Sequence, residues 1–444
     1  MARLRGLREV EIGDAPISRF RTLLEAEAWS DLVQTMARLR TALEGHAIWN
    51  VNSTARGGGV AELLIALVPY SRGAGVDERW VVIEGAPEFF DVTKTLHNFL
   101  HGVRPAGADL GEGARWLYEH TMSENGAALL DQVRPGDVAV LHDPQTAGLA
   151  PVLRARGVRT VWRSHIGVDA PNDVVREGWA FLQPYVRAAD AAVFTRLAYV
   201  WDGLQGLRIE IIPPCIDPFA PKNSDLEDGE VTSALDHASL PAGARYMLQV
   251  SRWDRLKDPA GVLQAFAEHI APHTDAFLVL AGPAAASVGD DPEQPAVLAD
   301  VDDRRGRLPS GVRERVLVAQ LPMDDIVENA TIVNALQRRA AVVVQKSIAE
   351  GFGLTVAEAM WKSRPVVASR VGGIEDQIEH GRSGLLVDDP RDLQAFGEAV
   401  VDVLRDEARA AEYGREARQR VARLFITPRH LIAQGRLIAD LYAG

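Results

Sequence analysis

The chain has 444 residues, 47% of them hydrophobic and 25% charged, which is enough for two globular domains and argues against a disordered chain. Its 48 lysines and arginines stand against 61 aspartates and glutamates, a net charge of −13 at pH 7, which disfavours general attraction to nucleic acid or anionic lipid. A phosphorylated substrate would therefore have to be held by local cations.

The sequence also indicates the cellular compartment in which the protein is expected. Cys215 is the only cysteine, which excludes an intrachain disulfide and a cysteine-rich zinc site and fits a reducing cytoplasm. Residues 1–10 alternate arginine with leucine and lack the apolar stretch of a signal peptide. The apolar stretch at 63–68 is far shorter than the roughly 20 residues that cross a bilayer. We therefore expect a cytoplasmic protein without membrane spans.

Short apolar runs alternate along the chain with longer stretches of helical spacing. The first series predicts strands at 47–51, 80–83, 138–141, 160–162, 191–194 and, in a shorter run, 209–212, with helices at 61–69 and 113–133. After an acidic stretch at 223–239, the second series predicts strands at 246–250, 277–281, 316–318, 341–344, 365–368 and 384–387. This alternation favours parallel sheets covered by helices on both faces.

Four prolines, Pro213, Pro214, Pro218 and Pro221, lie between the two series and predict a domain boundary near Asp217. Residues 283–311 are rich in aspartate, proline and glycine and predict a long loop that can include one short helix.

The segment 345–360 carries the most specific signal. The predicted strand at 341–344 runs into a loop with two glycines, Gly351 and Gly353, and then into a helix, whose free N–H groups suit a diphosphate. Glu350 and Glu358 flank this turn and can accept hydrogen bonds from hydroxyl groups. Thr355 and Glu358 also fit a helix capping box, but that alternative explains neither Glu350 nor the glycines.

Two cations follow the first strand of the second series. Ligands of open parallel sheets bind beyond the carboxyl ends of strands, where Arg252 and Lys257 would lie, and a leaving diphosphate needs positive charge. The alternative is a solvated surface pair with Asp254 or Asp258.

In the first series, a glycine loop at 52–62 again joins strand to helix. The dinucleotide fingerprint G-x-G-x-x-G fails because Glu62 occupies its third glycine position. Glu84 follows a strand where a ribose-binding acid would sit, which keeps a dinucleotide-dependent oxidoreductase open. The other alternative is a turn that has no role beyond the geometry of the chain. We favour a loop that lies above the reaction centre.

Further polar residues follow other strands of the first series. His165 could contact a reacting sugar, although a lone histidine is more often structural. The segment 142–145 could bind sugar hydroxyls or form an ordinary Asp-Pro turn. Asp300 and Asp302 have the D-x-D form of metal-dependent sugar transferases, but no strand pattern precedes them and we expect solvated surface. P-loop, zincin and nucleophile-elbow motifs are missing from the sequence.

The segment from Glu350 to Glu358 resembles the E-x7-E motif of family 4 retaining glycosyltransferases. The resemblance extends towards the trehalose glycosyltransferring synthases through 142–145, 162–165, 213–218, 249–259 and 350–361, and runs from about residue 47 to the C-terminus. The E-x7-E element is specific for the superfamily, and the matches in the first series carry the narrower resemblance. One departure is Lys346-Ser347, where many members carry Pro-Ser.

The resemblance implies the α/β GT-B fold, with two Rossmann-like, doubly wound parallel-sheet domains facing across a cleft. Residues 1–217 would bind the acceptor and residues 218–424 the nucleotide sugar, and a helix at about 425–444 would pack back on the first domain. The donor-binding residues it implies are Gly58, Gly59, Arg252, Lys257, Glu350, Gly351, Phe352, Gly353, Leu354, Thr355 and Glu358. The catalytic residues would be Glu350, His165, Arg252 and Lys257, and the acceptor-binding residues Asp143, Gln145, Arg163 and His165.

The implied reaction transfers glucose from a nucleoside diphosphate glucose to glucose with retention, forming trehalose reversibly. It needs no covalent cofactor and no protein nucleophile, no metal ligand is predicted, and magnesium is compatible with the motif without being required. The expected partners are these small molecules, with no nucleic acid or membrane, and a homodimer is compatible with the resemblance. The alternatives are a trehalose phosphorylase of the same fold, an NAD-dependent oxidoreductase and a non-catalytic sugar-nucleotide sensor.

Overall fold

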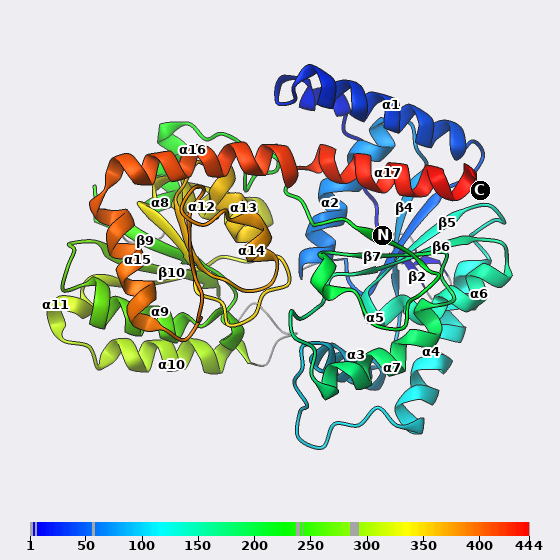
Figure 1. Cartoon of the computed structure of the whole chain (residues 1–444), viewed down its shortest axis with the longest axis horizontal. Coiled ribbons are helices and arrows are strands. Elements are labelled where there is room, and N and C mark those ends of the chain that lie inside the picture. Colours follow the sequence, from blue (N-terminus) through cyan, green and yellow to red (C-terminus); the bar gives the residue numbers. More distant parts are fainter. Residues whose placement is uncertain are drawn as a thin grey trace. The chain divides into compact units, whose positions relative to one another are not determined.

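The computed structural model describes residues 3–4, 7–55, 58–236, 240–241, 243–284 and 293–443. The chain forms two compact units (Figure 1), the first made of Met1–Cys215 with Thr427–Gly444 and the second of Ile216–Ile426. Each unit has its own sheet and its own apolar core.

Within the described residues, the sheet of the first unit has eight strands in the order β1-β2-β4-β3-β5-β6-β7-β8. β2 pairs antiparallel with β1 and β4, and the strands from β4 to β8 run parallel to one another. The strands are β1 (Arg3–Leu4), β2 (Leu7–Glu9), β3 (Ile48–Asn52), β4 (Glu78–Ile83), β5 (Val138–His142), β6 (Arg159–Ser164), β7 (Ala191–Phe194) and β8 (Arg208–Ile211).

Helices cover both faces of this sheet. In Figure 1, α1, α2 and α17 lie on one face and α3, α4 and α7 on the other. The helices are α1 (Ala26–Ala42), α2 (Gly58–Gly73), α3 (Pro87–Leu100), α4 (Glu112–Leu130), α5 (Asp143–Thr146), α6 (Ala150–Ala155), α7 (Asp173–Val186) and α17 (Thr427–Ala443).

The second unit has an all-parallel sheet in the order β11-β10-β9-β12-β13-β14. Its strands are β9 (Tyr246–Val250), β10 (Phe277–Pro283), β11 (Val316–Leu321), β12 (Val342–Gln345), β13 (Val366–Ser369) and β14 (Leu385–Val387). Its helices are α8 (Asp228–Asp236), α9 (Pro259–Ala265), continued by the π-helical η5 (Phe266–Ile270), α10 (Gln294–Gly306), α11 (Ser310–Arg313), α12 (Ile326–Arg339), α13 (Leu354–Trp361), α14 (Gly373–Gln377), α15 (Leu393–Arg405) and α16 (Glu407–Leu424).

The predicted strands of both series are present, because their apolar runs are the buried strands of two covered parallel sheets. Every residue of β3, β5 and β9 is buried, so these strands show no alternation of polar and apolar residues.

Two predictions about elements need correction. The antiparallel strands β1 and β2 at the N-terminus were not predicted, because they are only two and three residues long. The predicted loop at 283–311 contains the 13-residue helix α10, which keeps Val301 in the core while Asp300 pairs with Arg304 at 2.9 Å. The aspartates of the D-x-D sequence therefore lie on a helix, and part of the predicted loop, 285–292, lies outside the described residues.

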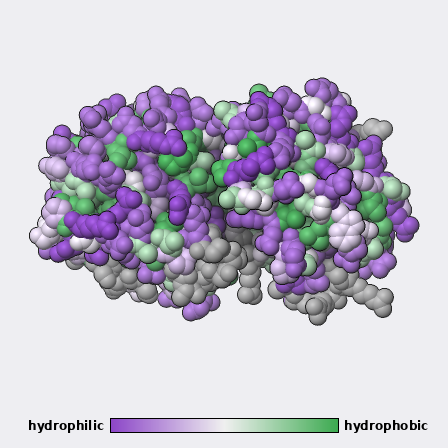
Figure 2. All heavy atoms as spheres, turned by 90° about the horizontal axis from the view of Figure 1, so that it is seen from below, coloured by the Kyte–Doolittle hydropathy of each residue, from purple (hydrophilic) through white to green (hydrophobic). Residues whose placement is uncertain are grey.

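On the face shown in Figure 2, hydrophilic residues predominate on both units and apolar residues form small separate patches. Among the described residues, no helix is both long and apolar enough to cross a lipid bilayer.

Asp137 directly precedes β5 and holds neighbouring segments together at the edge of the first sheet where β5 begins. Its carboxylate is 3% exposed and accepts hydrogen bonds from Ala47 N at 3.0 Å, Trp49 Nε1 at 3.0 Å and Arg134 N at 2.9 Å. One buried acid thus satisfies three donors from two segments.

We expect Asp137→Ala to lower the free energy of unfolding by about 3 kcal/mol, because it leaves buried N–H groups without an acceptor. Urea unfolding followed by tryptophan fluorescence measures this loss. Asp77→Ala is the control, since Asp77 is an exposed acid paired with Arg79, and should cost less than about 1 kcal/mol. Equal losses in the two variants would contradict the assigned role.

Candidate functional site

Two loops of the second unit leave the same edge of its sheet, because β9 and β12 are neighbouring parallel strands. The loop after β9 and the loop after β12 are joined by a backbone hydrogen bond from Ile348 N to Leu256 O at 2.7 Å. The Gln249 amide also donates to Lys257 O at 2.8 Å. The two loops therefore form one connected surface at the carboxyl ends of these strands.

Lys257 and Glu350 meet on this surface. Lys257 Nζ lies 2.5 Å from Glu350 Oε2, and the two side chains are 18% and 12% exposed. The Ser347 hydroxyl donates to the same carboxylate oxygen at 3.3 Å and accepts from Gln345 Nε2 at 2.9 Å. The structure thus brings together two of the predicted residues, with the acid held on two sides.

The backbone between Glu350 and α13 is held in one conformation. Gly353 precedes the helix with φ +88°, and a Cβ there would lie 3.1 Å from Ile374 Cγ1, so a side chain would strain the turn. Gln377 Nε2 donates to Phe352 O at 2.5 Å. The loop therefore presents the first two N–H groups of α13, which precede the bond from Val356 N to Gly353 O at 3.0 Å, at a fixed place suited to an anion.

Glu358 lies one turn further along α13 and is 3% exposed. Its Oε1 is 3.7 Å from Lys222 Nζ, while Oε2 has no hydrogen-bond partner among the described residues. The residue that caps α13 is Gly353, without a side-chain cap, so the capping-box alternative for Thr355 and Glu358 is wrong. A buried carboxylate oxygen without a partner is costly, which points to a ligand hydroxyl.

Lys362 lies behind Glu358, one turn further along the chain. Its buried ammonium donates to Gln337 Oε1 at 2.8 Å and to Asn223 Oδ1 and Glu358 O, both at 3.1 Å. Burial lowers the pKa of Lys362 to about 7, and the nearby Glu358 carboxylate opposes this change. Nothing in the sequence singles out this lysine, because two of its three acceptors, Gln337 and Asn223, are distant in the chain.

Arg252 and Lys346 differ strongly in exposure. The Arg252 side chain is 58% exposed, 3.4 Å from Asp254, in the loop after β9. Lys346 is 1% exposed and forms an ion pair with Asp258, whose φ of +47° and hydrogen bond from Gly261 N begin α9. This pair joins the two loops and gives a structural reason for lysine at the position where the sequence departs from the family pattern.

In the first unit, residues 143–146 form the short helix α5 rather than an isolated Asp-Pro turn. Asp143 has φ +63°, and its Oδ1 accepts from His165 N at 2.7 Å. Tyr118 OH donates to Pro144 O at 2.7 Å, and Gln145 is half-buried in the same helix. The structure thus brings Asp143, Gln145 and His165 to one edge of the first sheet.

The His165 ring contacts His142, which was predicted only as part of the segment 142–145. His165 Nε2 lies 3.1 Å from His142 Nδ1, and His142 Nε2 lies 3.1 Å from Asn50 Oδ1. Asn50 Nδ2 donates to Glu78 Oε1 at 2.7 Å. Asn50 and Glu78 were not predicted, because their only signal in the sequence is a polar residue inside, or just before, an apolar strand.

The other predicted residues of the first unit, Arg163 and the glycines at 58–59, make no side-chain hydrogen bond within the described residues to the group formed by Asp143, Gln145 and His165. Arg163 is buried, and its guanidinium lies 2.8 Å from His430 Nε2 and donates to Ile212 O at 3.0 Å, so it belongs to the interior of this unit. Burial lowers the pKa of Arg163 to about 10. Gly58 and Gly59 begin α2, Gly58 with φ +79°, while Arg56 and Gly57 of the same predicted loop lie outside the described residues.

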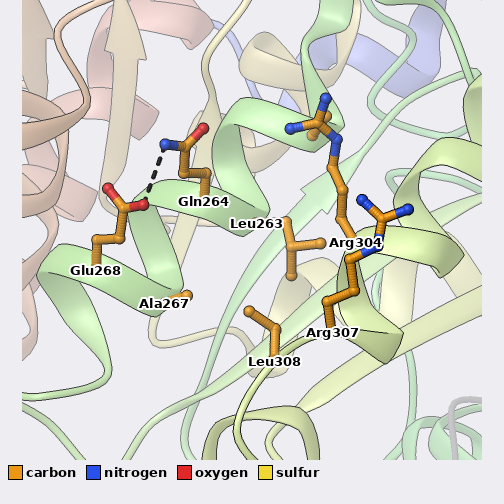
Figure 3. Close-up of a pocket in the computed structure, with 8 residues that line it drawn as sticks. Leu263, Gln264, Ala267, Glu268, Arg304, Arg307 and Leu308 are labelled. Carbon is orange, nitrogen blue, oxygen red and sulfur yellow. Dashed lines mark hydrogen bonds between the residues drawn. The ribbon is translucent and has the colours of Figure 1, made fainter.

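The groove drawn in Figure 3 lies elsewhere, between α9–η5 and α10. It encloses about 200 Å³ and is lined by Leu263, Gln264, Glu268, Arg304 and Leu308, among others, and it contains none of the predicted site residues. In the described ranges, no three histidine, cysteine or acidic side chains are grouped so that they could hold a metal ion.

The fold agrees with that of known GT-B glycosyltransferases. The crystal structure of an alpha,alpha-trehalose-phosphate synthase (UDP-forming) from Burkholderia xenovorans in complex with glucose-6-phosphate superposes with a TM-score of 0.71 over 90% of this chain and 100% of that one, at 16% identity. The predicted GT-B class, with two doubly wound α/β units, is confirmed.

Sequence comparison narrows the class. The family model "Trehalose synthase, N-terminal domain" matches residues 50–201, and "Glycosyl transferases group 1" matches residues 236–420. The trehalose synthase of Rubrobacter xylanophilus is 36% identical over 98% of this chain and 99% of its own length, whereas the trehalose phosphorylase of Pleurotus sajor-caju is 27% identical over 88% of this chain and 57% of its own length. The chain belongs to the trehalose synthase family of glycosyltransferases, which confirms the predicted resemblance.

Lys362 makes stability depend on pH. In the folded chain its pKa is about 7, against an ordinary value of 10.5, so between these values the unfolded chain binds the extra proton. The free energy of unfolding should therefore rise with pH in this window, by up to about 1.4 kcal/mol per pH unit. Urea unfolding at pH 7, 8 and 9 should show this rise relative to Lys362→Met, and parallel pH profiles for the two proteins would contradict it.

Proposed function

We propose that the chain is a retaining glucosyltransferase that moves glucose from a nucleoside diphosphate glucose to free glucose and so forms trehalose. The observation that carries the proposal is the contact of Lys257 Nζ with Glu350 Oε2 at 2.5 Å beside the first turn of α13. It supplies a cation, an acceptor for sugar hydroxyls and backbone N–H groups at one place, which is what a sugar diphosphate requires.

On the donor side, Arg252 and Lys257 bind the diphosphate, and the unpartnered Glu358 oxygen accepts from the ribose. Glu350 and the backbone of residues 351–355 hold the transferred glucose. Family membership supports these roles, because the E-x7-E motif spans Glu350 to Glu358.

On the acceptor side, Asp143, Gln145, Arg163 and His165 bind the glucose that receives the sugar. His165, with Gly58 and Gly59, borders the anomeric carbon. The hydrogen bond from His165 N to Asp143 Oδ1 at 2.7 Å supports a joint role for these two residues.

In the reaction, the bond from C1 to the diphosphate oxygen breaks and an acceptor hydroxyl oxygen bonds to C1 on the same face of the sugar. The hydroxyl proton passes to the departing phosphate, so the protein supplies no nucleophile. The Arg252 and Lys257 cations stabilise the charge that grows on the diphosphate. The scheme requires no metal, and turnover in EDTA, compared with turnover in added magnesium, tests this.

We place the reaction in the cytoplasm, where a single reduced cysteine such as Cys215 persists. Glucose, trehalose and the nucleotide sugar are the partners, without nucleic acid or membrane. A homodimer stays a prediction, which light scattering coupled to size-exclusion chromatography tests.

We expect Glu350→Ala to lower turnover on the order of 100-fold, because misplacing a reacting sugar by about 1 Å is enough for such a loss. The assay offers ADP-, UDP- and GDP-glucose with glucose and identifies α,α-trehalose by NMR. Glu398→Ala, an exposed acid on α15, is the control. Wild-type turnover in Glu350→Ala would contradict the role of this acid.

The phosphorylase alternative makes a different prediction. Trehalose with inorganic phosphate should give no glucose phosphate, whereas trehalose with a nucleoside diphosphate should regenerate nucleotide sugar, because the cationic surface and Glu358 together favour a nucleotide. Release of glucose 1-phosphate at a comparable rate would favour phosphorolysis. Donor binding without turnover would instead favour a non-catalytic sensor.

A further inference from the structure

A line of buried polar side chains crosses the first sheet and ends at His165. Its members come from β4, β3, β5 and the residue after β6, which are successive neighbours in the sheet. In order they are Glu78, Asn50, His142 and His165, joined by contacts of 2.7, 3.1 and 3.1 Å. The first three are at most 3% exposed, while His165 is half-buried.

The orientation of the Asn50 amide is set by two acceptors. Its nitrogen lies 2.7 Å from Glu78 Oε1 and 3.5 Å from the backbone oxygen of Arg79. The reversed amide would place an oxygen against a carbonyl oxygen that has no proton to donate. The Asn50 oxygen therefore faces His142.

This orientation fixes the proton on His142. An amide oxygen only accepts hydrogen bonds, so His142 Nε2 carries a proton and donates to Asn50. Burial, together with the nearby Arg163 cation, lowers the pKa of His142 to about 3, so the ring is neutral. Its Nδ1 is then an acceptor, and among the described residues it faces His165 Nε2 at 3.1 Å.

His165 Nε2 must in turn be the donor, which leaves Nδ1 of the same ring with a lone pair. The ring of His165 is also kept neutral. Burial lowers its pKa, and the neighbouring Arg163, His142 and His430 lower it further. The His165 backbone N–H is bound to Asp143 Oδ1 at 2.7 Å, so the residue is held at both its backbone and its ring.

We propose that Glu78, Asn50 and His142 are positioning residues that hold His165 in the Nε2–H tautomer, so that its Nδ1 accepts a hydrogen bond from a sugar hydroxyl. The contact with sugar rests on the proposed function, whereas the tautomer does not. A site that accepts in this way discriminates against sugars that lack the hydroxyl, because its nitrogen would then be left unpaired.

The tautomer is measured directly by long-range ¹H–¹⁵N NMR of the full chain, with the His165 signals assigned by their loss in His165→Asn. We expect one neutral form with the proton on Nε2 from about pH 6 to 8. A proton on Nδ1, or a His165 that titrates with an ordinary pKa near 6.5, would overturn the proposal.

Variants at His142 test whether the line of hydrogen-bonded side chains contributes to catalysis. His142→Leu removes the acceptor, so His165 should populate both tautomers and kcat/KM should fall about tenfold, the effect of one lost hydrogen bond. His142→Gln can donate to Asn50 and accept from His165, and should recover most of the loss and the single tautomer. His120→Leu, an exposed histidine on α4, is the control.

The measurements separate this proposal from the function on which it rests. Binding of a nucleoside diphosphate, which uses second-unit residues, should be unchanged in His142→Leu. A cooperative urea unfolding transition followed by tryptophan fluorescence reports that the first unit, which carries the substitution, is folded. If His165 has the expected tautomer but no trehalose forms, the assigned reaction fails and the hydrogen-bond chain stands. If trehalose forms but His142→Leu changes neither the tautomer nor kcat/KM, the positioning role is wrong.

Discussion

Neighbouring parallel strands end at the same edge of a sheet, and in both units this constraint brings together loops that are distant in the sequence. In the second unit it places Lys257 beside Glu350, 93 residues apart in the chain. In the first unit it aligns Asn50, His142 and His165, which come from three neighbouring strands or their ends. The candidate chemistry of each unit therefore depends on strand order more than on any single loop.

Charge is arranged locally in a chain that is acidic overall. Burying an isolated charge is very unfavourable, and a buried pair is tolerated when its hydrogen bonds are satisfied. Lys346 follows this rule with Asp258, and Lys362 has three oxygen acceptors. Glu358 departs from it at one oxygen, and this departure supports the proposal that the acid binds a ligand.

The sequence predicted most of the sheet strands, because a strand buried on both faces is an unbroken apolar run. Glu350 was selected because its motif has a fixed spacing around a glycine turn, and Lys257 because it follows the first strand of the second series; the structure brings the two into contact. Asn50 and Glu78 could not be selected, because a polar residue in a strand has meaning only when its neighbour across the sheet is known. The length of helix α10 was underestimated, because aspartates and arginines surround the few apolar residues, among them Val297 and Val301, that it packs into the core. The roles of the site residues stay predictions, and Arg163 is the one whose buried position fits its predicted contact with sugar least well.

The order of segments along the chain has a consequence for synthesis. The first unit is made of two pieces, and its last helix, α17, follows the whole of the second unit in the sequence. Arg38 on α1 and Arg208 on β8 both bind Asp440 of this helix, at 2.7 and 3.0 Å. During translation the second unit can thus complete its fold while the first still lacks the helix that covers α1. A ribosome-bound chain should expose that uncovered surface until α17 has emerged, so the first unit completes its fold after the second.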